Sequence, residues 1–207
     1  STRLLKLQQG LVCGERLNPT GKKTLQQALL YSDFGYLQQE ALSQQEAGAH
    51  FLDLNVGVPN ADEVDLLCRA TKKVQEICDL PLQLDSSNPE AIGAALRVYN
   101  GVPVINSING SGPVLKALLP LLAKYGASAV ALTLDEQGIP ETVEGRLRIA
   151  KRIIARAAAR GINKNRLIFD ALVMAVSSNQ SYGLLTLETL RSLKKMGVLT
   201  TIGLSNV

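Results

Sequence analysis

Acids and amides at the ends of short apolar runs are the residues of this 207-residue sequence best suited to chemistry. Buried parallel strands have such runs, and their carboxyl ends are where an α/β barrel builds its active site. One polar side chain after another at these ends predicts a ring of hydrogen-bonding groups around a single ligand. The set consists of Glu15, Asn18, Asp53, Asn55, Asp85, Asn106, Asp135, Asp170 and Asn206.

The mixture of carboxylates and amides indicates what kind of ligand would fit. Carboxylates accept hydrogen bonds from an N–H-rich ring, whereas amides both donate and accept. The set therefore suits a flat heterocycle with alternating donors and acceptors, such as a pterin. A metal site is the main chemical alternative, because Asp and Asn oxygens are good ligands for Mg²⁺.

Other catalytic chemistries lack the residues they need. His50 is the only histidine, and it precedes a predicted strand, at the end opposite to the expected site. A Ser-His-Asp triad is therefore not expected. The three cysteines, Cys13, Cys68 and Cys78, show no C-x-x-C spacing, so we expect reduced thiols and assign no zinc ligand.

The elements that must position these polar ends alternate between apolar runs and amphipathic stretches, as in repeated βα units. No G-x-G-x-x-G follows the first run, which argues against a dinucleotide-binding Rossmann sheet. Asn60 and Asn88 are the expected N-caps of the helices after the second and third runs. The seven predicted strands are Leu11–Glu15, Phe51–Asn55, Leu80–Asp85, Val102–Asn106, Ala129–Leu134, Leu167–Asp170 and Thr200–Asn206.

A closed barrel of this kind typically needs ~250 residues and an eighth strand. We therefore expect an α/β fold of the TIM (β/α)8-barrel type that lacks its last helix-strand-helix portion. Residues 1–207 would form one C-terminally incomplete domain. Because an incomplete barrel leaves two unpaired sheet edges, we expect marginal stability or self-association, for example as a homodimer.

Composition and charge narrow the environment and the partners. With 46% hydrophobic and 19% charged residues, the chain is typical of a globular protein. We find no signal peptide and no apolar run near the ~18 residues of a membrane span, and we expect a cytoplasmic protein. Five Tyr, three Phe and no Trp make a nucleic-acid partner improbable.

The net charge of +4 is mild, but basic residues gather in one helical stretch. We interpret this stretch as the solvated face of an outer helix, with docking of an anionic partner as the alternative. Its members are Arg146, Arg148, Lys151, Arg152, Arg156 and Arg160.

Several segments carry a resemblance to a known family. Gly14-Glu-Arg-Leu-Asn-Pro-Thr-Gly21 resembles the G-E-R-[IT]-N-x-T-G segment of the pterin-binding methyltransferases. These are the folate domain of cobalamin-dependent methionine synthase and the methyltetrahydrofolate:corrinoid protein methyltransferases. The likeness continues in order along essentially the whole chain, through residues 52–57, 82–87, 97–101, 105–110, 133–140 and 203–206. The family fold is a (β/α)8 barrel, in agreement with the predicted strands.

The resemblance implies roles for individual residues. Asp85, Asn106 and Asp170 would hold the polar edges of the pterin ring, and Asn206 would approach N5, the nitrogen that carries the methyl group. Four further residues match the family's first loop and its D-x-N motif and are expected to bind or support the substrate: Glu15, Asn18, Asp53 and Asn55.

The implied reaction moves the N5 methyl group of 5-methyltetrahydrofolate to cob(I)alamin. The cobalamin or other corrinoid would be carried by the partner, a corrinoid protein or a cobalamin-binding domain. Asn206 would be the catalytic residue, stabilising the N5-protonated form. Two alternatives remain: an enzyme like dihydropteroate synthase, which shares the barrel and the pterin site, or a non-catalytic folate-binding fragment. Against the first, the strand ends carry no Lys or Arg for a departing diphosphate, apart from Arg16 in the first loop.

Overall fold

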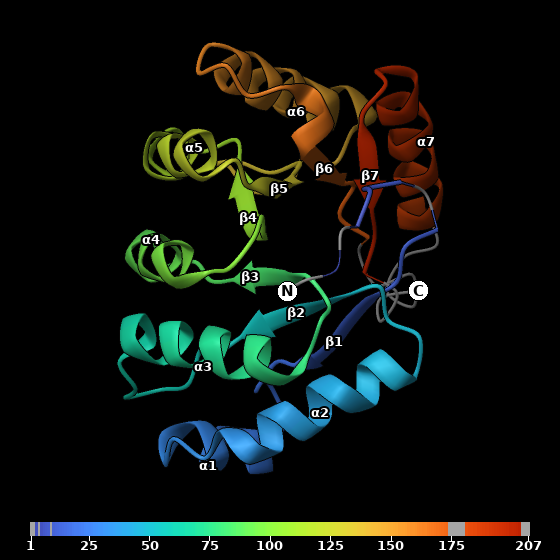
Figure 1. Cartoon of the computed structure of the whole chain (residues 1–207). Helices are drawn as coiled ribbons and strands as arrows, with labels where there is room; N and C mark the ends of the chain where they lie inside the picture. Colours follow the sequence, from blue (N-terminus) through green and yellow to red (C-terminus); the bar gives the residue numbers. More distant parts are fainter. Residues whose placement is uncertain (1–2, 4, 9, 174–180, 204–207) are drawn as a thin grey trace. The chain divides into compact units, whose positions relative to one another are not determined.

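The computed structural model describes residues 3, 5–8, 10–173 and 181–203 (Figure 1). The chain divides into two compact units, residues 1–106 and residues 107–207, which are described separately. Seven strands lie in the described part of the chain, and each unit alternates strands with helices. None of the helices in the described ranges is long and apolar enough to cross a membrane.

In the first unit, parallel strands lie side by side in chain order, and helices connect them. The strands are β1 (Cys13–Leu17), β2 (Phe51–Asn55), β3 (Leu82–Asp85) and the first half of β4 (Val104–Asn109). The helices are α1 (Lys23–Leu30), α2 (Phe34–Glu46), α3 (Glu63–Ile77) and α4 (Pro89–Val98). In Figure 1, α3 and α4 lie side by side along the same side of β2 and β3.

Side-chain caps fix where α2, α3 and α4 begin. Asn88 caps α4 as predicted, because its Oδ1 accepts the Glu90 N–H at 2.9 Å. The prediction of Asn60 as the cap of α3 was wrong. Asp62 caps this helix, accepting N–H groups of the first turn, while Asn60 lies in the preceding turn with a left-handed φ of 65°. Both residue types are good caps, so the side chain nearer the first apolar residue of the helix decides.

The core of the first unit follows from the alternation of side chains along each strand. Leu52 and Leu54 on β2 and Leu82 and Leu84 on β3 are fully buried and lie on the face that the helices cover. Asp53 and Asn55, on the same strand β2, consequently lie on the opposite face. The helix layer therefore fixes which polar side chains of the strands share the other face.

The second unit contains the parallel strands β5 (Ser128–Leu132), β6 (Leu167–Asp170) and β7 (Leu199–Thr201), in that order. The strands β2 and β6 match their predicted bounds, whereas β1, β3, β4 and β5 begin or end one to three residues away from theirs. The strand β7 begins one residue before its predicted start and ends at Thr201, and residues 204–206 of that prediction lie outside the described residues. The helices are α5 (Gly112–Tyr125), α6 (Val143–Ala158) and α7 (Ser181–Lys195), with the short 3₁₀ turn η1 (Lys164–Arg166) before β6.

One member of the predicted basic face does not belong to it. Arg146 on α6 is only 1% exposed, whereas Arg148, Lys151, Arg152 and Arg156 are exposed. Its guanidinium donates hydrogen bonds to backbone carbonyls, which makes burial of a charge tolerable. The solvated-face interpretation was therefore wrong for this residue.

Candidate functional site

Polar side chains from three adjacent strands of the first unit form two rows. The parallel register places Asn55 beside Asp85, at the carboxyl ends of β2 and β3, and Asp85 beside Asn106, in the middle of β4. One layer deeper, Asp53 lies beside Gln83. Residues two apart on a strand share a face, so both rows lie on the face opposite the buried leucines. We call these five residues the polar rows.

Hydrogen bonds join the two layers of the polar rows. The Asp53 Oδ1 atom accepts from Gln83 Nε2 at 2.6 Å and from Asn106 Nδ2 at 3.2 Å. Asn55 Nδ2 donates to Asp85 Oδ2 at 2.9 Å, while Asn55 Oδ1 accepts the Gly57 N–H at 2.8 Å. Each amide is thereby oriented with its donor toward a carboxylate, and the side chains are held before any ligand arrives.

The two carboxyl groups of the polar rows have perturbed acidities. Burial, with the charge of Asp85 as the next cause, raises the pKa of Asp53 from 3.8 to about 7, although Gln83 and Asn106 donate to it. Asp53 is 5% exposed, which explains the size of this effect. Burial also raises the pKa of Asp85, against hydrogen bonds from Asn55 and Asp53 that lower it. A neutral Asp53 that donates to Asp85 thus favours the ionised form of Asp85.

The first loop contributes at the edge of this region. Glu15 is exposed on β1, and its charge is among the smaller causes that raise the pKa of Asp53. Asn18 follows β1, and its Oδ1 accepts the Thr20 N–H at 3.0 Å, an Asx turn that shapes the loop. Its amide NH₂ group is not used by this turn. Burial, together with the charge of Asp53, raises the pKa of the Cys13 thiol on β1, which makes it a poor nucleophile.

In the second unit, Asp170 ends β6, and the backbone of its own turn holds its side chain. Its Oδ1 atom accepts the Leu172 N–H at 2.7 Å, and Leu172 has a left-handed φ of 58°. Arg146 donates to the carbonyls of Ala171 and Leu172, at 2.5 and 3.2 Å, and to Pro140 O at 3.0 Å. Burial raises the pKa of Asp170, opposed by the Leu172 N–H and the charge of Arg146.

The predicted residues therefore fall into separate groups. Asp53, Asn55, Asp85 and Asn106 are brought together in the first unit, with Glu15 and Asn18 on the β1 side of it. Asp170 belongs to the second unit and is described there alone. Asn206 lies outside the described residues. Within the described ranges, no group of three or more His, Cys, Asp or Glu side chains is arranged to hold a metal ion.

Two residues of these regions were not predicted as part of the site. Gln83 lies two positions before Asp85 on the same strand, so the alternation of the strand carries the signal that places both on one face. Arg146 carries a signal in the periodicity of α6, because it lies three, four and seven positions before Ile149, Ala150 and Ile153 on the buried face of the helix. Its charge had grouped it with the basic stretch instead.

The chemistry open to this arrangement is recognition of a polar ring. An ionised carboxylate between amides offers strong acceptors and neutral donors at fixed positions. Among the described residues, no thiol, hydroxyl or imidazole is hydrogen-bonded to the side-chain carboxyl group of Asp53 or Asp85.

The sequence of this chain is similar to those of several known proteins. A family model described as "Pterin binding enzyme" matches residues 14–207. Methionine synthase from Mycobacterium leprae (strain TN) is 34% identical over 209 residues, covering 95% of this chain and 17% of that protein. Methylcorrinoid:tetrahydrofolate methyltransferase from Eubacterium limosum is 30% identical over 204 residues, covering 95% of this chain and 74% of that protein. The chain thus spans less than a fifth of the methionine synthase.

The fold of this chain is also similar to that of solved structures. Dihydropteroate synthase from Xanthomonas albilineans in complex with 7,8-dihydropteroate matches with a TM-score of 0.70 and 24% sequence identity. The match covers 97% of this chain and 74% of that one. At this identity the likeness concerns the fold alone.

Proposed function

This chain belongs to the family of pterin-binding enzymes, and on that premise we propose that it binds 5-methyltetrahydrofolate and transfers its N5 methyl group to cob(I)alamin. The cobalamin or related corrinoid is carried by a partner protein or domain. The proposal takes residues 1–207 as one pterin-binding domain whose strands form most of a barrel. The observation that carries it is the pair of polar rows, with the Asp85 carboxyl group between Asn55 and Asn106.

Asp85 is the residue best suited to hold the pyrimidine edge of a pterin. This edge presents an amino group and a ring N–H next to each other, and one carboxylate accepts both. Asp85 is less buried than Asp53, and the neutral form of Asp53 favours its charge. Asn106, with both a donor and an acceptor, then faces a neighbouring polar edge of the ring, and Asp170 a third.

The remaining residues of the first unit support this contact. Gln83 and Asn106 donate hydrogen bonds to the Asp53 carboxyl group, which lies one layer below Asp85. Asn55 donates a hydrogen bond to Asp85 itself. Positions held in advance reduce the entropy that a ligand must lose on binding. Glu15 and the unused NH₂ group of Asn18 provide further contacts from the β1 side.

Methyl transfer needs help at the nitrogen that loses the methyl group. Tetrahydrofolate is a poor leaving group unless N5 is protonated or strongly hydrogen-bonded. Asn206 is the residue proposed for this role, through an amide hydrogen bond that strengthens as charge develops on N5. Such preorganised hydrogen bonds contribute ~3 kcal/mol to the stabilisation of a transition state. The nucleophile is the cobalt of the partner, so no nucleophilic side chain is required here.

Binding is tested by isothermal titration calorimetry of the whole chain with 5-methyltetrahydrofolate. p-Aminobenzoylglutamate, which lacks the pterin, serves as the control ligand and should not bind measurably. Asp85→Asn should weaken binding about 100-fold, because it removes the charged acceptor. Asp65→Asn on α3, where the side chain is 59% exposed, is the matched control and should leave affinity unchanged. Equal affinity of both variants would contradict the proposal.

Catalysis is tested by following methylation of free cob(I)alamin. Asn206→Ala should lower kcat about 100-fold while changing the Kd for 5-methyltetrahydrofolate less than about threefold. Equal losses in kcat and affinity would leave Asn206 with a binding role only. Two further results would replace the proposal: formation of dihydropteroate from a pterin diphosphate and p-aminobenzoate, or tight folate binding without any methyl transfer.

A further inference from the structure

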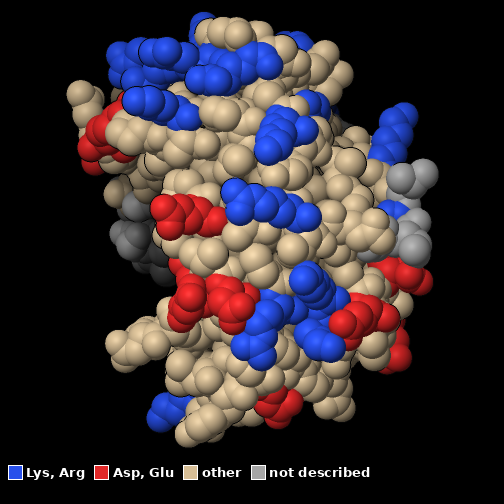
Figure 2. All heavy atoms as spheres, turned by 60° about the vertical axis from the view of Figure 1, so that its left-hand side comes forward, with Lys and Arg blue, Asp and Glu red and all other residues tan. Residues whose placement is uncertain are grey.

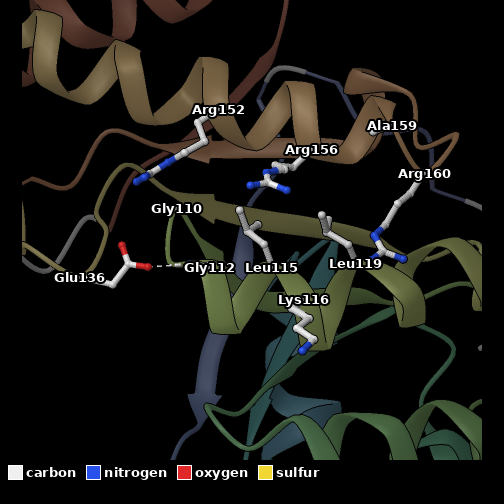
Figure 3. A pocket seen from close by; sticks show the side chains of 10 residues that line it. All are labelled: Gly110, Gly112, Leu115, Lys116, Leu119, Glu136, Arg152, Arg156, Ala159 and Arg160. Atoms are coloured by element: carbon white, nitrogen blue, oxygen red, sulfur yellow. Dashed lines mark hydrogen bonds between the residues drawn. The ribbon is translucent and has the colours of Figure 1, made fainter.

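A cavity of about 550 Å³ lies between helices α5 and α6 of the second unit (Figure 3). Its floor includes Leu115 and Leu119 of α5, and Ala159 at the end of α6 lies beside it. Arg152, Arg156 and Arg160 line its α6 side. We call this cavity the α5–α6 groove. Its volume falls in the range of sites that bind ligands or segments of chain.

The three arginines of the groove recur at every fourth position. Residues four apart lie on one face of a helix, so Arg152 and Arg156 share a face of α6, about 6 Å apart along its axis, and Arg160 follows beyond the end of the helix. In Figure 3, Arg156 points into the space between the helices, and Arg160 lies toward the far end. Figure 2 shows Lys and Arg side chains gathered along the top of the molecule, the part formed by α5 and α6.

Acidic residues neutralise only one end of the groove. Asp135 forms an ion pair with Arg152, and Glu136 Oε1 accepts the Gly112 N–H at 2.6 Å. At the other end, neither Arg156 nor Arg160 has an acidic partner among the described residues. The groove thus has an apolar floor and, over most of its length, unneutralised positive charge.

Helix stability alone does not account for this charge. A cation in the last turn of a helix interacts favourably with the carbonyl end, which explains one arginine, Arg156. Arg160 lies beyond the last helical residue, and Arg152 lies in the middle of α6. Asp135 accounts for Arg152, whereas Arg160, which lines the same cavity as Arg156, is better explained by a negatively charged ligand.

At the Arg152 end of the groove, the loops after β4 and β5 approach α6 closely and keep the groove narrow. Gly110 follows β4 directly, and a Cβ atom at this position would lie 2.7 Å from Ile149 Cγ2 and 3.1 Å from Leu134 O. Ile149 is buried and Leu134 O belongs to the backbone, so neither can move aside easily. The groove therefore begins at loops that follow β4 and β5, the strand ends where the polar residues lie in this chain.

We propose that the α5–α6 groove is a docking surface for an acidic, partly apolar segment of the corrinoid-carrying partner. The inference rests on the proposed function, which requires such a partner to approach the carboxyl ends of the strands. The segment would enter the groove at the loops after β4 and β5 and extend along α6 to Arg156 and Arg160 at its other end. Carboxylates of the segment would face Arg156 and Arg160, and its apolar side chains would cover Leu115 and Leu119. Charge complementarity of this kind acts chiefly on the association rate and on the choice of partner.

The test compares two acceptors, free cob(I)alamin and a corrinoid protein loaded with cob(I)alamin, in the same methyl-transfer assay. The variant Arg156→Glu/Arg160→Glu should raise the KM for the corrinoid protein at least about 30-fold at low salt. Its kcat and KM with free cob(I)alamin should stay within about twofold of the wild-type values. Added salt should raise the KM of the wild-type chain and change that of the variant little.

The matched control is Arg148→Glu/Lys151→Glu, which makes the same change of charge on exposed positions of α6 outside the groove. This control should change the KM for the corrinoid protein less than about threefold. Equal effects of the two variants, or no effect of either, would overturn the docking proposal. If the wild-type chain methylates neither acceptor, the proposed function itself fails, and the docking proposal fails with it.

Discussion

The carboxylates at two strand ends of this chain are held in different ways. In the first unit, the side chains of neighbouring strands fix Asp53 and Asp85, through donors on Gln83, Asn106 and Asn55. In the second unit, the backbone fixes Asp170, through the Leu172 N–H of a left-handed turn. The first arrangement is a network of side chains, and the second is a clamped turn.

The difference indicates which perturbation each region tolerates. A side-chain network can lose one donor and keep its backbone, so its failures should appear in acidity and binding. The clamped turn depends on Arg146, whose three carbonyl partners belong to two segments of the chain. Its failure should appear first in stability.

The largest expected effect is that of Arg146→Met. The variant keeps most of the buried volume but leaves carbonyls of Pro140, Ala171 and Leu172 without their donor. We expect the free energy of unfolding to fall by about 3 kcal/mol, because each buried unsatisfied group costs ~1–3 kcal/mol. Urea denaturation followed by circular dichroism measures it. Arg148→Met, at an exposed position of the same helix, should cost less than about 0.5 kcal/mol.

The variant Arg146→Lys separates two effects of Arg146: its contribution to stability and its effect on how Asp170 is placed for the ligand. Lysine restores the charge but offers no planar fork for several carbonyls at once. We expect partial recovery of stability without recovery of affinity for 5-methyltetrahydrofolate. Full recovery of both would show that the charge alone suffices, and the contrast with the first unit would weaken.

A second prediction concerns pH. The folded chain holds the Asp53 proton with a pKa of about 7, whereas the unfolded chain releases it near 3.8. The unfolded chain therefore binds fewer protons between these values, and the free energy of unfolding falls as the pH rises from about 4 to about 7. Above about pH 7 this contribution is constant.

Asp53→Asn should remove most of that dependence and stabilise the chain by about 2 kcal/mol at pH 8. Asparagine still accepts from Gln83 and donates toward Asp85, so the geometry should persist. Asp85 and Asp170 also have raised pKa values, and a weaker slope of the same sign should remain. Denaturation curves from pH 4 to pH 8 measure it, with Asp65→Asn as the control. An unchanged slope in Asp53→Asn would place the titrating group elsewhere.

The smallest effect is expected at the edge of the site. Asn18→Asp keeps the oxygen that accepts the Thr20 N–H, so stability should change by less than about 0.5 kcal/mol. It removes the NH₂ donor proposed to face the ligand, so affinity for 5-methyltetrahydrofolate should fall about fivefold, the value of one ordinary hydrogen bond. Isothermal titration calorimetry measures the affinity. An unchanged affinity would mean that Asn18 only stabilises the turn after β1 and does not contact the ligand.

Much of the fold follows from the sequence. Apolar runs ending in acids or amides predicted seven strands, the parallel α/β class and the grouping of Asp53, Asn55, Asp85 and Asn106. These features depend on local alternation and on chain order, which a sequence displays directly. The resemblance to the pterin-binding methyltransferases is confirmed by the family match and by the similarity to a methionine synthase and a corrinoid methyltransferase. The roles of the site residues stay predictions.

The remaining features depend on which of two equivalent options packs better. Asn60 and Asp62 are both good helix caps, and only the folded loop shows that Asp62 is used. For Arg146 the sequence does carry a signal, because it lies on the same face of α6 as Ile149 and Ile153, whereas Arg148 lies on the opposite, exposed face. The acidity of Asp53 likewise depends on the depth of burial, which a sequence does not display.

Gly110 limits how this chain can diverge. Exposed arginines of α6 can be exchanged at little cost to the fold, so a lineage can readily change the sign or the density of charge along this side. The absent side chain at Gly110 cannot be supplied, because even a methyl group would collide with Ile149 and with the backbone of Leu134. The proposed docking can therefore change through surface substitutions, whereas the close approach of the loop after β4 to α6 requires glycine at position 110.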